Sequence, residues 1–277
     1  MYNIYRFSVI CDLRSMLIFL IVYNTCCTEC RLQNFGVIKN FYTLLKHNKA
    51  DYYFFSDQDD IWLEDKLAVT LAEAEKYDSQ KPLLVYTDLK IVDRDLNILH
   101  ESMIKTQSDH ANTELVQELT ENTVTGGTAM INHTLAELWT STEDLLMHDW
   151  YLALLASALG NLAYVDYPTE LYRQHDTNVL GARTWTKRMK NWIKPHKLVE
   201  KYWWLINASQ TQARFLLDLA LTPEKRDLVE NFTTIMDKPL IQRIKTLNQY
   251  GLRKNRTFHT LVFRTLIITK FGYRRKK

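Results

Sequence analysis

The hydrophobic positions in the first two thirds of the chain follow two different periods. Short apolar runs rich in aromatic and β-branched residues are typical of strands, whereas apolar residues recurring every three or four positions are typical of amphipathic helices. Strands are predicted within residues 16–23, 50–56, 82–88, 91–99, 122–131 and 161–175. Helices are predicted over residues 34–48 and 63–77, from about Asn132, and over 147–160.

This alternation of strands and helices predicts an α/β domain with a largely parallel sheet flanked by helices. Sheets of this kind bind ligands at the carboxyl ends of their strands. Asp57, Asp59, Asp60 and Asp88 all stand at the predicted ends of strands. The pattern therefore predicts a polar site at that edge of the sheet.

The pattern changes after Gly181, where long amphipathic segments with several tryptophans replace the short runs. Thr222 followed by Pro223 is typical of the start of a helix. We predict three parts: an atypical N-terminal segment over residues 1–33, the α/β domain over 34–182, and a basic helical appendage over 183–277.

The net charge of +3 conceals an uneven distribution. Residues 183–277 hold 22 lysines and arginines against six acidic residues, and residues 1–182 hold 13 against 26. Such asymmetry indicates an anionic partner for the basic part, either a membrane surface or a nucleic acid. Because no known reader motif for nucleic acids is present, we expect no nucleic-acid binding, and peripheral contact with an anionic membrane remains open beside a solvated basic face.

The remaining composition excludes several classes of protein. With 46% hydrophobic residues the chain can bury a large core, which argues against disorder. The apolar run Met16–Tyr23 is too short to span a bilayer and is predicted to be a buried strand. All four cysteines lie within residues 11–30, and their one C-x-x-C lacks a second ligand pair at zinc spacing. We expect a cytoplasmic protein without a metal-thiolate centre.

Three of the four residues Asp57–Asp60 are carboxylates, which suit hard cations such as Mg²⁺ or Mn²⁺. A calcium loop is excluded by spacing, because Trp62 stands where glycine is needed and Ala68 where glutamate is needed. Capping of the following helix is the alternative, and it is strongest for Asp60 and Glu64.

Five motifs, in this order, resemble the family 2 glycosyltransferases, in their bacterial rhamnosyltransferase-like branch, which have the GT-A fold. The motifs are "DYYFFSDQDDIW", "VYTDLKIVD", "NTVTGGTAMIN", "MHDWYLALLASALG" and "LYRQHDTNVLGA", between Asp51 and Ala182. The resemblance implies an inverting transfer of a sugar, rhamnose being one candidate, from a nucleotide-diphosphate donor. It further implies a saccharide or lipid-linked acceptor in bacterial cell-surface polysaccharide synthesis.

The resemblance assigns the donor side to four positions. Asp57 and Asp59 match the D-x-D pair that holds Mg²⁺ or Mn²⁺ on the donor diphosphate. His175 matches a position that in some relatives adds a metal ligand, with a structural histidine as the alternative. Arg173 is a candidate for the phosphates, and Asp88 is a further donor-binding candidate at its strand end.

The acceptor side is assigned in the same way. Asp149 matches the general base that removes the proton of the acceptor hydroxyl, with a plain helix cap as the alternative. The dipole of its helix is expected to keep Asp149 ionised. Gly126, Gly127 and Trp150 are candidates for the sugar pocket, with a tight turn and a core aromatic as their alternatives.

The N-terminus departs from the family pattern. Neither the usual opening strand with its nucleotide-binding loop nor a D-D-G-S-like turn is found in residues 1–32. We expect an atypical or truncated N-terminus that lacks part of the donor site. Two other functions therefore stay open: a non-catalytic remnant of such an enzyme, and a metal-dependent phosphoryl-transfer enzyme, which needs no acceptor-side base.

Overall fold

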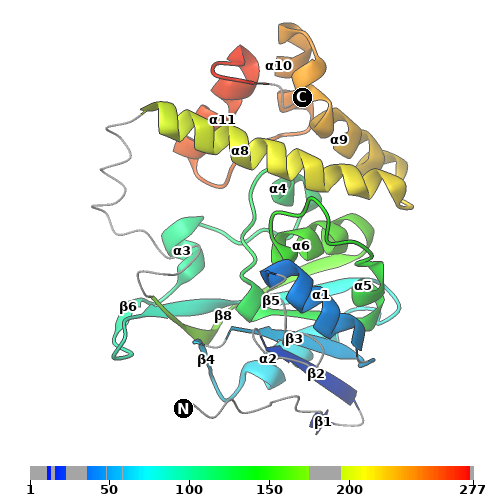
Figure 1. Ribbon diagram of the computed structural model, residues 1–277, viewed down its shortest axis with the longest axis vertical. Helices are drawn as coiled ribbons and strands as arrows, with labels where there is room; N and C mark the ends of the chain where they lie inside the picture. The colour runs from blue at the N-terminus through cyan, green and yellow to red at the C-terminus, as the bar shows by residue number, and fades with distance from the viewer. Residues whose placement is uncertain are drawn as a thin grey trace.

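The computed structural model describes residues 11–13, 16–22, 36–47, 49–57, 59–174 and 195–274. In this part of the chain an eight-stranded sheet carries helices on both faces, and a group of helices lies beyond one end of the α/β layers (Figure 1).

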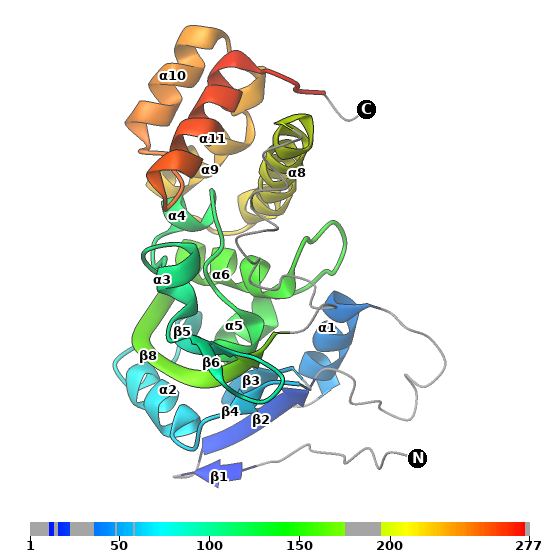
Figure 2. The same cartoon turned by 90° about the vertical axis from the view of Figure 1, so that its left-hand side faces the viewer.

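The strands join in the order β1-β2-β3-β7-β5-β8-β4, with β6 paired to β5. Their bounds are β1 Cys11–Leu13, β2 Met16–Val22, β3 Tyr52–Ser56, β4 Ile61–Trp62, β5 Leu83–Val92, β6 Ile98–His100, β7 Ala129–Asn132 and β8 Asn161–Arg173. The strands predicted from the hydrophobic pattern are confirmed, and β8 runs on through Pro168 as one long, curled strand (Figure 2).

The prediction of a largely parallel sheet is wrong. Among the described strands only β2–β3 and β5–β8 pair in parallel, and the other pairs are antiparallel. The reason is the position of β7, a short strand inserted between β3 and β5 and antiparallel to both. Strands β2, β3, β5 and β8 nevertheless point the same way, so their carboxyl ends share an edge.

Alternate residues of β3 face two separate cores, which explains why the run "YYFF" is apolar throughout. Tyr53 and Phe55 join the larger core, which is covered by α1 (Val37–His47), α5 (His133–Leu138) and α6 (His148–Leu159). Tyr52 and Phe54 join the smaller core on the opposite face, which is covered by α2 (Lys66–Ala74). The sheet is therefore buried on both sides.

Two short helices and one turn connect these layers. Helix α3 spans Met103–Gln107, α4 spans Leu115–Glu118, and the 3₁₀ turn η2 spans Gly126–Thr128 directly before β7.

The described residues of the predicted C-terminal region are helical. They form α8 (Pro195–Arg214), η3 (Phe215–Asp218), α9 (Pro223–Thr233), η4 (Ile235–Asp237), α10 (Leu240–Gln249) and α11 (Thr257–Thr269). As predicted, Thr222 caps α9, because its side chain accepts a hydrogen bond from the backbone of Lys225.

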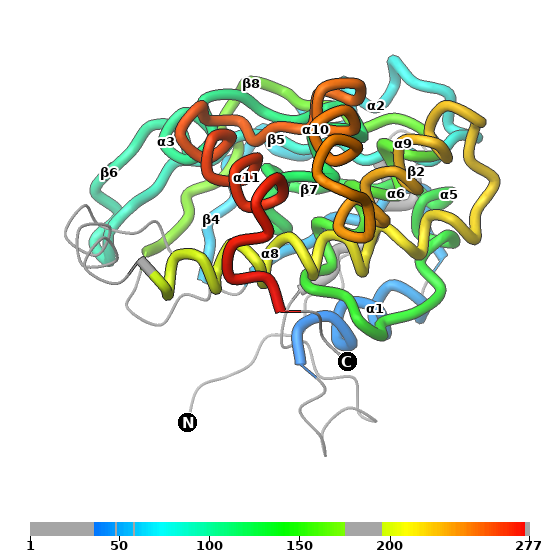
Figure 3. Tube along the Cα trace, turned by 90° about the horizontal axis from the view of Figure 1, so that it is seen from above, coloured from blue at the N-terminus to red at the C-terminus, as the bar shows by residue number. Residues whose placement is uncertain are grey.

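These helices dock on the α/β domain beside α4 (Figures 1 and 2), and Figure 3 shows them from above, with α8 passing below α10 and α11 in the view. The Lys254 Nζ donates to the carbonyl of Thr120 at 2.6 Å, and the Gln212 amide oxygen accepts from the backbone of Leu146 at 2.6 Å. Buried residues of both parts belong to one hydrophobic core. Among the described residues, no helix combines the length and the apolar character that crossing a membrane requires.

Candidate active site

The candidate site forms where β3 ends and β7 begins. Asp57 follows β3, the glycines of η2 precede the antiparallel β7, and Asp149 lies in the first turn of α6. Antiparallel neighbours place the end of one strand beside the start of the next. The sheet order therefore gathers these three segments, which are far apart in the sequence, at one edge.

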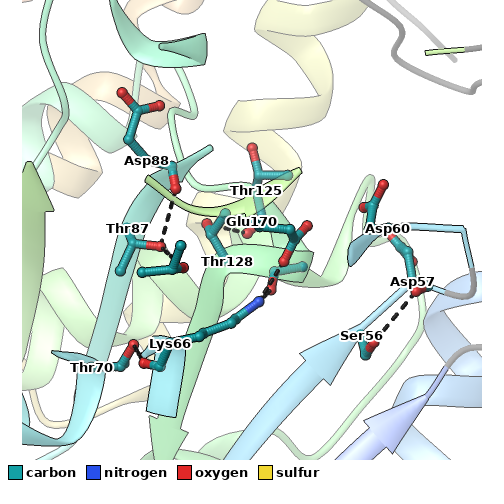
Figure 4. Close-up of polar contacts among 12 residues, drawn as sticks. Ser56, Asp57, Asp60, Lys66, Thr70, Thr87, Asp88, Thr125, Thr128 and Glu170 are labelled. Carbon is teal, nitrogen blue, oxygen red and sulfur yellow. Dashed lines mark hydrogen bonds and ion pairs between the residues drawn. The ribbon is translucent and has the colours of Figure 1, made fainter. Parts of the chain in front are cut away.

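A buried ion pair lies at the centre of the site. Lys66 opens α2 and is 1% exposed, and its Nζ contacts the carboxylate of Glu170 on β8 and the carbonyl of Gly127 (Figure 4). The same Nζ lies 3.9 Å from the ring centroid of Trp62, a cation–π contact. Glu170 is fully buried as well. The pair thus ties α2, η2 and β8 together.

The two glycines are required by close packing rather than by an unusual backbone. A Cβ on Gly127 would lie 2.4 Å from the Glu170 Oε1, and a Cβ on Gly126 would lie 2.9 Å from the His148 Nε2. Neither distance leaves room for a side chain. Close packing thus accounts for both glycines, and contact of their backbone with a sugar stays a prediction.

The acids after β3 lie in a region of excess negative charge. Burial, together with the charges of Glu170 and Asp59, raises the pKa of Asp57 to about 6, and Lys66 opposes the shift. Burial also raises the pKa of Asp60 to about 9, with the charge of Glu170 and a hydrogen bond between the two carboxyl groups adding to it. Lys66 thus offsets the repulsion among these carboxyl groups only in part, and protonation relieves the rest.

Helix capping does not explain these acids. Asp65 occupies the N-cap of α2 without a capping side-chain bond, and its carboxylate instead accepts from the Tyr167 hydroxyl at 2.7 Å. Asp60 accepts from the backbone N–H of Arg173 at 3.1 Å, at the end of β8. The capping alternative is therefore wrong for Asp60.

Asp149 lies in the buried part of this edge. Burial raises its pKa to about 7, the charge of Asp57 acts in the same direction, and backbone N–H groups of Trp150 and Gly126 oppose it. The expectation that the helix dipole keeps Asp149 ionised is wrong in direction, because desolvation outweighs the dipole. Met147, not Asp149, is the N-cap of α6, so the plain-cap alternative is wrong too.

This raised pKa makes a stability prediction. Between pH 4 and 7 the folded protein keeps a proton on Asp149 that the unfolded chain has released, so this group stabilises the fold less as the pH rises. Wild type should lose about 2–3 kcal/mol of unfolding free energy relative to Asp149→Asn between pH 5 and 8. Denaturant titrations of both proteins at pH 5 and pH 8, in the presence of a chelator, measure this difference in unfolding free energy.

The exposed Glu143 of the preceding loop provides the matched control. Glu143→Gln should leave the pH dependence of stability as in wild type. A constant difference between wild type and Asp149→Asn across this range would contradict the raised pKa.

His148, which the motifs did not single out, packs behind η2. Its ring lies 4.3 Å from that of Phe41 and 5.3 Å from that of Phe55, measured between centroids. Burial lowers its pKa to about 3, and neither ring nitrogen has a hydrogen-bond partner among the described residues. His148 is therefore a neutral packing residue that fixes the position of Gly126.

Three further site residues were missed at the sequence level: Lys66, Glu170 and Glu118. Burial raises the pKa of Glu118 well above its ordinary value, and it is close enough to Asp149 for their charges to interact. None of the three stands in an apolar run, so the local sequence carries no signal for its burial. Lys66 shares a buried helical face with Thr70, one turn later.

Asp88 does not end its strand as predicted. Strand β5 continues to Val92, and Asp88 lies at a register shift between β5 and β8. Its carboxylate accepts from the Ser102 hydroxyl and from the backbone N–H groups of Leu89, Met103 and Ile104, at the start of α3. These four hydrogen bonds use the Asp88 carboxylate to anchor the start of α3. Its contacts therefore give no support to a role in binding the nucleotide-sugar.

Trp150 is a core aromatic, which was the alternative to sugar stacking. It is 5% exposed, and its indole N–H donates to the carbonyl of Glu118 at 2.8 Å. The sugar-pocket prediction for Trp150 is therefore wrong, because helix α4 covers the ring.

The other donor-side predictions stay open. Arg173 lies at the end of β8, with its backbone bound to Asp60. His175 and the C-x-x-C at Cys27 lie outside the described residues. Within the described ranges no three His, Cys, Asp or Glu side chains form a cluster that could hold a metal ion. Metal binding by Asp57 and Asp59 thus remains a prediction.

Comparisons with known proteins bear on the family. No protein-family model matches the chain. A curated relative, the dTDP-rhamnosyl transferase RfbG of Shigella flexneri, is 32% identical over 164 residues, which cover 53% of this chain and 52% of RfbG. The chain therefore spans about half the length of the curated relative it matches.

Solved structures of S. aureus TarS are also similar. The TarS 1–349 fragment in complex with UDP-GlcNAc has a TM-score of 0.43 and 13% identity, covering 87% of this chain and 74% of TarS 1–349. The same fragment in a second structure has a TM-score of 0.43 and 12% identity, covering 87% and 73%. Scores below 0.5 describe a broad likeness only.

The match to RfbG agrees with the five motifs that lie in order between Asp51 and Ala182. Over 164 residues this chain is therefore similar to a curated rhamnosyl transferase, in keeping with the resemblance of its five motifs to family 2 glycosyltransferases.

Proposed function

We propose that this chain is an inverting glycosyltransferase that moves a sugar from a nucleotide-diphosphate donor to a hydroxyl acceptor. The observation that carries the proposal is the position of Asp149, a buried acid whose charge interacts with that of Asp57 at the same sheet edge. A buried acid with a pKa near 7, close to the two carboxylates Asp57 and Asp59, is compatible with this chemistry.

Asp57 and Asp59 would hold Mg²⁺ or Mn²⁺, with His175 as a further candidate ligand. These residues suit such an ion for two reasons. The carboxylates near Asp57 outnumber the buried lysine beside them, Lys66, and oxygen ligands suit hard cations. When bound, such an ion neutralises the charge that develops on the departing nucleoside diphosphate.

A side chain of the protein would take up the proton that the acceptor hydroxyl releases. Asp149 accepts the proton of the acceptor hydroxyl while the acceptor oxygen bonds to the anomeric carbon and the bond from that carbon to the diphosphate oxygen breaks. A carboxylate with a pKa of about 7 is half ionised at neutral pH, so it accepts a proton more readily than an ordinary aspartate. The pair of Lys66 and Glu170 fixes η2 beside it.

The name of the relative supports rhamnose on dTDP as the first donor to test. A saccharide or lipid-linked acceptor, a role in cell-surface polysaccharide synthesis and a place on the cytoplasmic face of the membrane complete the proposal. The basic C-terminal helices support the last part.

Calorimetric titration with dTDP-rhamnose and a set of UDP-sugars, with and without Mn²⁺, tests donor binding. We expect micromolar binding that requires the cation. Asp57→Asn should weaken binding by at least about tenfold, because it removes one charged ligand from the ion. The exposed Glu143→Gln serves as the matched control and should bind as wild type does.

Absence of binding by any donor, with or without Mn²⁺, would contradict the proposal and favour the non-catalytic remnant. Binding that is equally tight in a chelator would contradict the metal site alone.

A further inference from the structure

Exposed apolar side chains gather on the last two helices. Among the described residues, six of the eleven exposed large hydrophobic side chains lie between residues 240 and 271. They are Leu240, Ile241 and Ile244 on α10, Phe258 and Leu261 on α11, and Phe271 just after it. Ile241 is 79% exposed and Leu261 is 65% exposed, which is unusual for these residue types in a surface helix.

Helices α10 and α11 lie side by side and antiparallel (Figure 2). The Arg243 guanidinium near the start of α10 donates to the carbonyl of Ile268 near the end of α11 at 2.7 Å. The Arg264 guanidinium on α11 donates in turn to the side-chain oxygen of Asn248 near the end of α10. Leu247 and Phe263 occupy the buried sides. The exposed apolar residues are thus those left over after the two helices have formed their core.

The same segment is exclusively basic. From Leu240 to Lys277 the sequence contains 11 lysines and arginines and no aspartate or glutamate. Arg243 and Lys254 are buried and bind backbone carbonyls, so they are structural. Lys245, Arg253 and Arg274 are exposed and available to a partner.

Resting on the membrane placement in the proposed function, we propose that the α10–α11 pair binds the surface of an anionic lipid bilayer through the six apolar residues above and the exposed Lys245, Arg253 and Arg274. Apolar side chains beside cations and without acids match a bilayer interface, where the former enter the acyl boundary and the latter attract lipid headgroups. A nucleic acid would use the cations but leave Leu, Ile and Phe without favourable contacts.

This proposal moves the membrane contact away from Trp203 of α8, while Trp204 on the same helix is 51% exposed. Trp203 is buried, and its indole N–H donates to the carbonyl of Phe271 at 2.8 Å. The tryptophan therefore anchors the segment after α11 instead of entering lipid.

Flotation of the full chain with vesicles of phosphatidylcholine alone, or with added phosphatidylglycerol, tests the proposal without any sugar donor. We expect flotation only with the anionic vesicles, weakening as salt rises. The double substitution Lys245→Gln with Arg253→Gln should weaken partitioning about 30-fold, at roughly fivefold per cation. Ile241→Asp with Leu261→Asp should abolish it.

Matched controls distinguish binding through α10 and α11 from nonspecific hydrophobic adsorption. Ile98→Asp with Leu99→Asp changes two apolar residues on β6 that are 49% and 48% exposed, and it should leave flotation unchanged. Thermal melts of each variant confirm folding. Flotation that survives Ile241→Asp with Leu261→Asp would overturn the proposal. It would also be overturned by a dimer that these substitutions dissociate, or by oligonucleotide binding without flotation.

Discussion

Replacing Lys66 with methionine is expected to lower the free energy of unfolding by about 3–5 kcal/mol at pH 8. The substitution keeps most of the apolar stem but removes the cation from a site where Lys66 is 1% exposed and its partner Glu170 is fully buried. Glu170 would then face the carboxyl groups of Asp57 and Asp60 without a compensating charge. Urea titration of the purified variant measures the loss.

The double variant Lys66→Met with Glu170→Leu should recover much of the stability, since no charge of the pair is left unpaired. Lys76→Met, which removes an exposed lysine just after α2, is the matched control. Its ion pair with Glu73 is exposed on the lysine side, so its removal should cost far less stability than the removal of Lys66.

An equal loss for Lys66→Met and Lys76→Met would show that the buried pair does not organise the site. If the double variant folds but is no more stable than Lys66→Met alone, the carbonyl of Gly127 is the more important partner of Lys66.

Replacing Asp149 with asparagine is expected to reduce sugar transfer by about 10²–10⁴-fold while donor binding survives. The amide has nearly the same shape as the acid but cannot accept the proton of the acceptor hydroxyl. Wild-type kcat/KM should fall below about pH 7, where Asp149 becomes protonated. Transfer to an acceptor and donor binding by calorimetry, measured on the same preparations, separate the chemical step from affinity.

Asp57→Asn serves as the contrasting variant, because it should lose donor binding together with turnover. If Asp149→Asn keeps full turnover, the acceptor-side base is elsewhere. Cleavage of the donor diphosphate that requires Asp57 but not Asp149 would favour the phosphoryl-transfer alternative over the transferase.

Much of this architecture was predictable because local patterns encode it. The strand at Tyr52–Ser56, the helix at Val37–His47 and the start of α9 after Thr222 follow from periodicity and capping residues that act within a few positions. The acids directly behind β3 were placed correctly for the same reason. A strand end fixes where the residues that follow it must lie.

The tertiary structure decided what depends on distant neighbours. It inserted β7 between β3 and β5, engaged Asp88 at the start of α3, and buried Trp150 under α4. It also brought Lys66 to Glu170 across 104 positions of sequence and raised the pKa of Asp149 by desolvation, against the helix dipole. The sequence by itself determined the elements and the candidate acids, because these follow from local chemistry. Charge states and partners were decided by burial, which depends on how residues far apart in the chain pack together.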